Sequence, residues 1–299
     1  MSSLSTQDFR PRPGAEIFPT VVTRASKETN MSTLTTKEFR LFQSLVHREA
    51  GIFLSDQKRA LLIGRLAPRM RALAMTSFSQ YFDHVSADHN ELVLMLDAIC
   101  TNETHFFREP KQFEFLEQQL IPAWRAEGRR NVRVWSAGCS TGEEPYSIAM
   151  TLAYNLPGAM IDIVGSDLST KVLDRAASGL WSIERAKEIP VIYRKEFMLR
   201  GHGPMEGKMA AKPELLSMIR FERINLHHES YPLTGRFDLI FCRNVLIYFD
   251  APTKRRVIDR LLDRLEPSGY LFLGHSESLN QYDRVRAVGP TVYAQKECA

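Results

Sequence analysis

The spacing of hydrophobic residues changes along the chain and divides it into a helical part and a mixed part. A capping-box pattern at Thr35 precedes apolar residues that recur every three or four positions, which predicts a first helix ending at Gly51. A second helix is expected to be capped by Ser55 and to bend or break at Pro68, because an interior proline costs a helix about 3 kcal/mol. Two further helical patterns before residue 101 complete a small all-helical unit.

Beyond residue 130, short apolar runs alternate with helical patterns, an order typical of a parallel sheet flanked by helices. We expect strands at 132–135, 161–165, 219–224, 237–242 and 270–273, helices starting near 112, 143, 170 and 251, and a hairpin-like pair around Val285 and Val292. Glycines between 201 and 207 predict a small β excursion at about 195–221. The fold class is therefore α/β, with a mobile tail at 1–33, a helical domain at 34–104 and a sheet domain at 105–299.

Composition narrows the class of protein. The 299 residues include 44% hydrophobic and 25% charged side chains, as in soluble globular proteins. No apolar run approaches the roughly 18 residues of a membrane span, and no signal-peptide pattern is evident, so a cytoplasmic protein without membrane insertion is expected. The four cysteines have neither CxxC nor zinc-like spacing, so we expect no disulfide and no metal site. A net charge of +4 permits an acidic partner without requiring nucleic acid.

A strand, a glycine turn and a helix follow one another between 132 and 147. Gly138 and Gly142 allow the backbone to approach a bound molecule, and the helix behind them offers unpaired N–H groups. The spacing is Gly-x-x-x-Gly, not the Gly-x-Gly-x-x-Gly of dinucleotide enzymes. Glu143 and Glu144 come next, and two carboxylates would repel a pyrophosphate but suit an ammonium or sulfonium group.

Asp167 ends the next predicted strand, where an acid can accept hydrogen bonds from ribose hydroxyls. A glycine turn followed by such an acid is typical of S-adenosylmethionine enzymes. In the alternative, Gly138 and Gly142 serve only a tight turn and the acids cap helices. The position of Asp167 favours the ligand interpretation.

Other polar side chains follow parallel strands at the edge where open α/β sheets bind ligands. Asn225 and Leu226 end one strand, and an amide there can pair with an adenine edge. Arg243, Asn244 and Tyr248 follow another. Their alternative roles are capping of the next turn for the first two and core packing for the tyrosine.

The segment 101–110, TNETHFFREP, interrupts the helical pattern with polar side chains, two aromatics and an arginine. It joins the helical unit to the sheet domain, so we expect it near the ligand pocket. In the alternative, Phe106 and Phe107 fill the core and Arg108 is merely exposed.

The second predicted helix has a basic face. Lys58, Arg65 and Arg69 lie along one side of it, with Arg59 and Arg71 further round. Most such faces are only solvated. Because no acid occurs between positions 58 and 71, an acidic docking partner is favoured.

These stretches together resemble the CheR family, the chemoreceptor glutamate methyltransferases of bacterial chemotaxis. The resemblance runs from about residue 34 to the end and rests on TNETHFFREP at 101–110, WSAGCSTGEEPYSIAMTLA at 135–153, GSDLS at 165–169, RGHGPMEG at 200–207, FDLIFCRNVLIYFD at 237–250, HSESL at 275–279 and TVYA at 291–294. It implies a helical domain, a Rossmann-like methyltransferase domain and an inserted three-stranded β-subdomain. Two departures are Pro68 within the usual arginine-rich helix and Ser136 where methyltransferases commonly have an acid, so that Glu144 would carry more of the binding.

The resemblance also implies the cofactor and its site. S-adenosylmethionine, which becomes S-adenosylhomocysteine, is expected at Asn102, Thr104, Arg108, Gly138, Glu144, Asp167, Asn225, Leu226, Arg243 and Asn244. The methyl acceptor would be a glutamate carboxylate, which is already ionised at neutral pH and needs no general base. Arg108 would hold the carboxylate of the cofactor, although steering of the substrate is the alternative, and Tyr248 would orient the methyl group.

The implied partners are cytoplasmic domains of chemoreceptors, whose methylated helices are rich in acids. Contacts are expected from Lys58, Arg59, Arg65 and Arg69, and from Gly201, Gly203 and Gly207 if the β excursion holds a receptor C-terminal peptide by strand addition. We expect a monomer that binds no nucleic acid. Two alternatives are a methyltransferase for nucleic acid or small molecules, against which Asn244 lacks a following Pro-Pro-Tyr/Phe, and a catalytically silent binding module.

Overall fold

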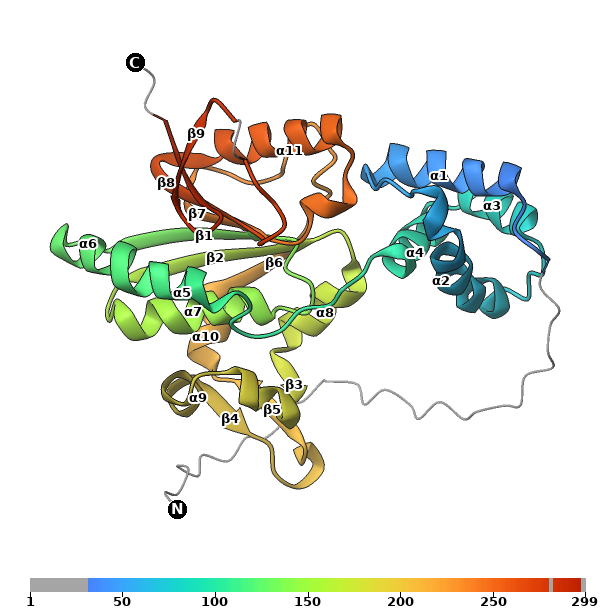
Figure 1. Cartoon of the computed structure of the whole chain (residues 1–299). Helices are drawn as coiled ribbons and strands as arrows, with labels where there is room; N and C mark the ends of the chain where they lie inside the picture. Colours follow the sequence, from blue (N-terminus) through green and yellow to red (C-terminus); the bar gives the residue numbers. More distant parts are fainter. Residues whose placement is uncertain (1–31, 280–281, 297–299) are drawn as a thin grey trace.

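The computed structural model describes residues 32–279 and 282–296 (Figure 1). The expected tail at 1–33 therefore lies almost wholly outside the described residues. Figure 1 shows a helical unit beside a larger α/β unit. Within the described ranges, no helix is both long and apolar enough to cross a membrane.

The helical unit contains α1 (Thr36–Ala50), α2 (Arg59–Ala72), α3 (Phe78–Ala87) and α4 (His89–Ile99). The capping box is confirmed, because Thr35 Oγ1 accepts from the Glu38 amide and the Glu38 side chain accepts from the Thr35 amide. The expected Ser55 cap is wrong: Ser55 precedes a single 3-10 turn, η1 (Asp56–Lys58), and its side chain makes no capping bond. The helix α2 continues through Pro68 to Ala72.

A seven-stranded sheet forms the centre of the α/β unit, in the order β6-β2-β1-β7-β8-β10-β9. Its strands are β1 (Asn131–Ala137), β2 (Met160–Asp167), β6 (Ile219–Arg223), β7 (Phe237–Cys242), β8 (Leu265–Leu273), β9 (Val285–Gly289) and β10 (Val292–Gln295). The first five in spatial order pair in parallel, and the last two add antiparallel pairs. The expected α/β class is confirmed.

Helices cover both faces of this sheet. In Figure 1, α11 (Ala251–Asp263) lies over one face, while α7 (Glu143–Asn155), α10 (Pro213–Met218) and α8 (Thr170–Ser178) lie toward the other. The helical segment before β1 consists of α5 (Pro110–Phe115), a π-helical turn η2 (Leu116–Leu120) and α6 (Ile121–Ala126). A short 3-10 turn, η5 (Leu246–Tyr248), follows β7.

A three-stranded sheet is inserted between α8 and β6, and we call residues 180–211 the insert. It pairs β3 (Leu180–Ser182), β5 (Lys208–Ala211) and β4 (Met198–Arg200), with η3 (Ile183–Glu188), α9 (Val191–Phe197) and η4 (Gly203–Met205) between them.

The expected bounds of 195–221 for this excursion are wrong at both ends. The small sheet begins at Leu180, α10 replaces the expected alternation, and residues 219–223 form β6 of the large sheet. Strands of three or four residues are too short to display a two-residue period, which explains the error.

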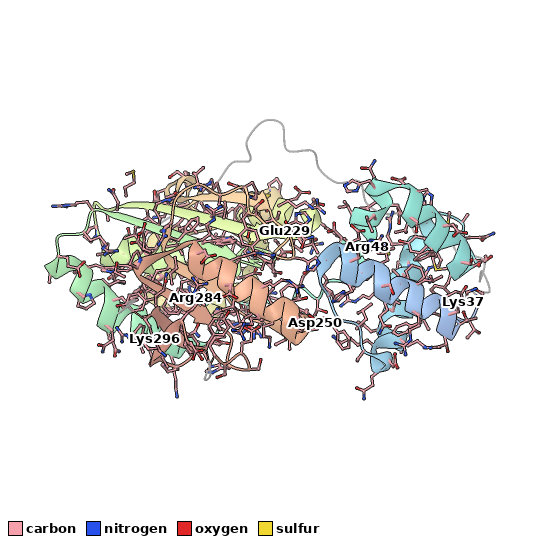
Figure 2. The ribbon with its side chains drawn as sticks, turned by 90° about the horizontal axis from the view of Figure 1, so that it is seen from above. Lys37, Arg48, Glu229, Asp250, Arg284 and Lys296 are labelled. Atoms are coloured by element: carbon pink, nitrogen blue, oxygen red, sulfur yellow. The ribbon has the colours of Figure 1, made fainter. Side chains whose placement is uncertain are left out.

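The helical unit contacts the α/β unit through the end of α1 and the segment after it. His47 Nε2 lies 2.9 Å from Asp250 Oδ2, and the Phe53 amide donates to the Tyr248 carbonyl at 2.7 Å. Figure 2 shows Arg48 of α1 on the side facing Glu229 and Asp250. This junction places the helical unit over the carboxyl end of the sheet.

Candidate functional site

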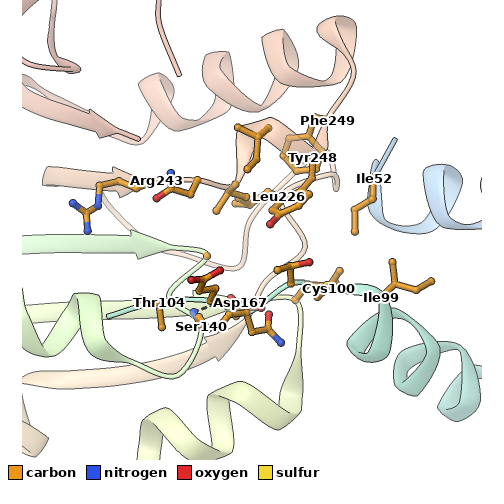
Figure 3. A pocket seen from close by; sticks show the side chains of 18 of the residues that line it. Ile52, Ile99, Cys100, Thr104, Ser140, Asp167, Leu226, Arg243, Tyr248 and Phe249 are labelled. Carbon is orange, nitrogen blue, oxygen red and sulfur yellow. Dashed lines mark hydrogen bonds between the residues drawn. The ribbon is translucent and has the colours of Figure 1, made fainter. Parts of the chain in front are cut away.

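A cavity of about 440 Å³ lies where the helical unit meets the carboxyl ends of β1, β2 and β7 (Figure 3). Its volume is in the range of small-molecule sites, and its place is where open α/β sheets bind ligands. The lining includes every residue that the sequence suggested for the cofactor: Asn102, Thr104, Arg108, Gly138, Glu144, Asp167, Asn225, Leu226, Arg243 and Asn244. Tyr248 and Lys58 line it too, together with Ile52, Leu54 and Leu61 from the helical unit.

The glycine turn has the expected backbone shape but uses its N–H groups differently. Gly138 has φ +87°, and a Cβ there would lie 2.3 Å from Val245 Cγ2, so only glycine fits against the loop after β7. The amides of Gly138 and Cys139 both donate to the Ser166 carbonyl, at 2.7 and 2.8 Å. These amides join two strand ends and are not offered to a ligand, contrary to the expectation.

Asp167 stands at the end of β2 with its carboxylate held by backbone. Its Oδ2 accepts from the Ser140 amide at 2.9 Å and its Oδ1 from the Ser169 amide at 3.0 Å. Burial raises the pKa of Asp167, and the backbone amides oppose this shift. Each carboxylate oxygen retains a lone pair, so Asp167 can accept further hydrogen bonds inside the cavity.

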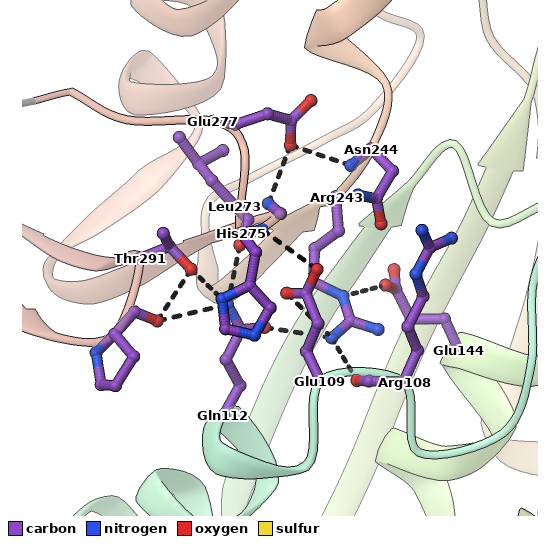
Figure 4. Close-up of polar contacts among 12 residues, drawn as sticks. Arg108, Glu109, Gln112, Glu144, Arg243, Asn244, Leu273, His275, Glu277 and Thr291 are labelled. Atoms are coloured by element: carbon purple, nitrogen blue, oxygen red, sulfur yellow. Dashed lines mark hydrogen bonds and ion pairs between the residues drawn. The ribbon is translucent and has the colours of Figure 1, made fainter.

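Glu144 and Arg243 form a buried ion pair behind the cavity (Figure 4). Arg243 Nε donates to Glu144 Oε2 at 2.6 Å, and Ser136 Oγ donates to Glu144 Oε1 at 2.6 Å. Ser136, the departure from the usual acid at this position, therefore orients Glu144. The sequence did not suggest this role for a serine.

Arg243 also holds the segment that carries Arg108. Its Nη1 donates to the Arg108 carbonyl at 2.6 Å and to Gln112 Oε1 at 3.0 Å. Gln112 in turn donates to the Leu273 carbonyl at 2.7 Å. The guanidinium is thus occupied by protein acceptors, which makes Arg243 an anchor of the cavity wall more than a ligand for the cofactor.

Glu277 is a buried residue for which the sequence alone suggested no role. Its carboxylate accepts from the amides of Gly274 and Asn244, both at 2.8 Å, and of Ile247 at 3.2 Å. Asn244 has φ +60°, a left-handed conformation that few side chains adopt and that this contact stabilises. Glu277 thereby shapes the loop that presents Tyr248. Its place in the HSESL motif was the available signal.

Asn225 lines the cavity, but its amide group binds the protein. Its Nδ2 donates to the Glu49 carbonyl of α1 at 2.6 Å, and its Oδ1 accepts from the His227 amide at 3.0 Å. These contacts argue against the expected pairing of the side chain with an adenine edge. Asn225 instead links the α/β unit to the helical unit by a hydrogen bond.

Arg108 and Tyr248 are both half-buried in the cavity wall. Arg108 Nη1 donates to the Glu103 carbonyl at 3.2 Å. Lys58 Nζ lies 5.7 Å from the centre of the Tyr248 ring, a cation–π distance. The helical unit therefore contributes directly to the wall beside the tyrosine.

Two members of the basic face on α2 bind within the helical unit, and their expected contact with a docking partner stays a prediction. Arg69 pairs with both oxygens of the buried Glu91, which also accepts from Tyr81 Oη at 2.8 Å. Arg59 Nη2 donates to Thr36 Oγ1 at 3.1 Å. The acid missing from α2 is supplied by α4, which a count of charges within one helix could not reveal.

The glycines of the insert serve the turn that joins β4 to β5. A Cβ on Gly201 would lie 2.0 Å from the Met205 carbonyl oxygen, so no larger residue fits there. Gly203 and Gly207 have φ of +56° and +76° and face open space. Turn geometry accounts for all three, and their contact with a partner stays a prediction.

The Asp167→Asn protein is expected to bind S-adenosylhomocysteine about ten to a hundred times more weakly. The reason is that a charged acceptor contributes roughly 1.5–3 kcal/mol, and that an amide NH₂ would face a backbone N–H of Ser140 or Ser169. Titration calorimetry measures the affinity, and Asp174→Asn on the exposed side of α8 is the matched control. Equal affinity of the Asp167→Asn and wild-type proteins would remove Asp167 from the ligand site.

Comparison with known proteins gives two family matches. Residues 102–294 match the family described as CheR methyltransferase, SAM binding domain, and residues 37–100 match CheR methyltransferase, all-alpha domain. The chain is 41% identical over 263 residues to chemotaxis protein methyltransferase 2 of Pseudomonas aeruginosa, covering 87% of this chain and 93% of that protein. It is 40% identical over 272 residues to the chemotaxis protein methyltransferase of Salmonella typhimurium, covering 89% and 92%.

Proposed function

The chain belongs to the CheR methyltransferase family, and from this premise we propose that it methylates glutamate side chains of bacterial chemoreceptors. It is an S-adenosylmethionine-dependent methyltransferase of chemotaxis. The proposal adds the acceptor: a glutamate carboxylate in the cytoplasmic part of a receptor, converted to a methyl ester. It places the enzyme in the cytoplasm as a monomer.

The donor set of the cavity fits the cofactor. Asp167 is a half-buried carboxylate held only by backbone amides among the described residues, so it suits ribose hydroxyls. Arg108 brings a guanidinium that the structure ties to one backbone carbonyl, so it suits a ligand carboxylate. Glu144 is already paired with Arg243, so it can accept a hydrogen bond without presenting an unbalanced charge.

The single observation that supports a carboxylate acceptor is that the described cavity wall offers neither a histidine nor a thiolate to remove a proton. No histidine is among the described residues that line the cavity. Burial raises the pKa of the Cys100 thiol to about 12, so Cys100 stays protonated. An amine or hydroxyl acceptor would need to lose a proton, whereas a glutamate is already ionised at neutral pH.

The residues of the chain then act by binding, orientation and exclusion of water. Bound S-adenosylmethionine supplies the methyl group from its sulfonium. Arg108 and Asp167 would hold the two ends of the ligand, and Tyr248 with the apolar rim of Ile52 and Leu54 would limit water near the acceptor. Alignment of a bound carboxylate in this way is worth several kcal/mol in rate.

The test is incubation of the protein with methyl-labelled cofactor and receptor-containing membranes. We expect label on the receptor that is released as methanol by mild base, as an ester requires. Label that resists base would favour a nitrogen acceptor. Tight cofactor binding without any transfer to receptor would favour the silent binding module.

Docking of the receptor is proposed at Arg65, with Lys58 nearer the cavity. Arg65 is half-buried on α2, one turn beyond the cavity-lining Leu61. Arg65→Glu is expected to slow receptor methylation up to about fivefold at low salt, because a rim charge contributes about 1 kcal/mol or less, and to have a smaller effect at high salt.

The matched control is Arg71→Glu, since Arg71 is exposed on another side of α2. Cofactor affinity should not change in either variant. Equal rates for Arg65→Glu and Arg71→Glu at low salt would show that the basic face of α2 is only solvated.

A second contact is proposed at the insert, whose small sheet has edges at β3 and β4. An extended receptor C-terminal peptide ending in an aromatic residue could add a strand there, and tethering would concentrate the enzyme near its substrate. We expect micromolar binding by fluorescence anisotropy. Gly207→Val should abolish it, while Gly207→Asn should retain it, because asparagine tolerates the left-handed backbone. Absence of binding by wild-type protein at high micromolar peptide would refute the tether.

A further inference from the structure

Side chains of η3 in the insert form hydrogen bonds with the backbone of residues 104–106, which belong to the segment beside the cavity. Arg185 Nη1 donates to the Thr104 carbonyl at 2.6 Å, and the Phe106 amide donates to Glu188 Oε2 at 3.0 Å. Arg185 and Glu188 also contact each other, with 3.4 Å between Nη1 and Oε2. The two side chains therefore hold one carbonyl and one amide of the same short segment.

Arg185 is tied at the same time to the first turn of α7. Its Nη1 lies 3.5 Å from Oε1 of the buried Glu143, and Thr141 Oγ1 donates to the other oxygen of that carboxylate at 2.6 Å. Glu143 and Thr141 belong to the glycine turn and the helix start that border the cavity. One guanidinium thus connects the insert, the 104–106 backbone and the glycine turn.

Aromatic packing reinforces the same connection. The ring of Phe106 meets Trp181 of β3 edge to face, with centroids 5.0 Å apart. The ring of Phe107 stacks on Tyr193 of α9 at 5.4 Å and an interplanar angle of 3°. Both aromatic residues of the TNETHFFREP segment therefore pack against the insert.

The backbone just after residues 104–106 contains two strained residues that need contacts with their surroundings to stay in place. Phe107 and Glu109 have φ of +51° and +60°, left-handed conformations that are strained for non-glycine residues and persist only where the surroundings hold them. Thr104 and Arg108, on either side of Phe106 and Phe107, line the cavity, whereas Arg185 and Glu188 do not. The conformation of this segment sets where the Arg108 guanidinium reaches.

We propose that Arg185 and Glu188 of the insert are positioning residues for the cofactor: they hold the 104–106 backbone so that Arg108 and Thr104 meet the ligand. The insert is then part of the cofactor site without touching the ligand. The inference rests on cofactor binding and is independent of which carboxyl group is methylated. It also predicts coupling in both directions, because linkage between two sites is reciprocal.

The first test compares cofactor affinity in paired variants. Arg185→Met keeps the length of the side chain and removes its donors, and Glu188→Leu removes the acceptor of the Phe106 amide. Each is expected to raise the dissociation constant of S-adenosylhomocysteine about tenfold by calorimetry, the effect of one lost charge-assisted hydrogen bond. Glu188→Gln retains an acceptor oxygen and should bind within about twofold of wild type. Glu184→Ala, an exposed position of η3, is the control.

The second test uses hydrogen exchange, which does not depend on turnover. In the wild-type protein, S-adenosylhomocysteine should slow exchange at residues 104–106 and at 183–188, although η3 does not line the cavity. Arg185→Met should lose the effect at 183–188. Wild-type affinity for S-adenosylhomocysteine in both Arg185→Met and Glu188→Leu, with or without a lowered melting temperature, would overturn the proposal. Arg185 and Glu188 would then only stabilise the fold of the insert.

Discussion

The Arg108→Ala enzyme is expected to transfer methyl groups about 10²–10³ times more slowly than the wild type while keeping its fold. Loss of one oriented electrostatic contact commonly costs a rate factor of that size. The fold should survive because the only hydrogen bond of the Arg108 side chain among the described residues goes to the Glu103 carbonyl, whereas the buried contact to Arg243 uses the Arg108 backbone. Steady-state rates on receptor membranes, together with a melting curve, measure both parts.

The matched control for this prediction is Lys111→Ala, an exposed cation on the first turn of α5. Its rate should equal that of the wild type. The two roles considered for Arg108 are separated by calorimetry: weakened binding of S-adenosylhomocysteine assigns the guanidinium to the cofactor, and unchanged binding with a slow rate assigns it to the substrate. Near wild-type activity with an unchanged melting temperature would support the alternative in which Arg108 is exposed and has no role in catalysis.

Arg243→Met is expected to lower the free energy of unfolding by about 3–5 kcal/mol. The substitution leaves the Glu144 carboxylate buried with only the Ser136 hydroxyl, and it removes the donor to Gln112 Oε1. Breaking a buried ion pair on one side carries a cost of that size, because the remaining charge stays desolvated. Urea denaturation measures it, and cofactor affinity should fall too, since the Arg108 carbonyl loses its anchor.

The double variant Arg243→Met with Glu144→Gln tests the reason for the loss. Neutralising the stranded carboxylate should recover part of the stability, so the effects of the two substitutions should not add. Arg236→Met, which removes an exposed arginine just before β7, is the control and should cost little. A loss below about 1 kcal/mol in Arg243→Met would contradict a stabilising role for the ion pair.

The amino-acid sequence alone was enough to place most elements of the sheet domain. The helix α8 and the strand β7 occupy the residues expected from periodicity, and α7 begins at the expected Glu143. These signals are local: side-chain spacing, glycine and capping residues act through neighbours in the chain. The short strands of the insert carry no such signal, and their bounds were missed for that reason.

The gathering of the candidate residues around one cavity also followed from the sequence, because the carboxyl ends of parallel strands share one edge of the sheet. Asp167, Asn225 and Arg243 each lie at or just beyond the end of a parallel strand and line the same cavity. The sequence did not show which of these side chains face the ligand and which bind other parts of the protein. Whether a polar side chain faces a ligand or another part of the protein depends on which distant segment packs beside it.

Only the tertiary structure decided these partners. Arg69 meets Glu91 from another helix, Asn225 meets the Glu49 carbonyl across the domain junction, and Arg243 meets Glu144 and Gln112 from separate segments. The physical reason is that backbone preferences act over a few residues, whereas a buried charge must be satisfied by whatever group the fold brings within hydrogen-bond distance. The order of helices and strands could therefore be derived from the sequence, whereas the role of each buried polar residue could be derived only from the tertiary structure.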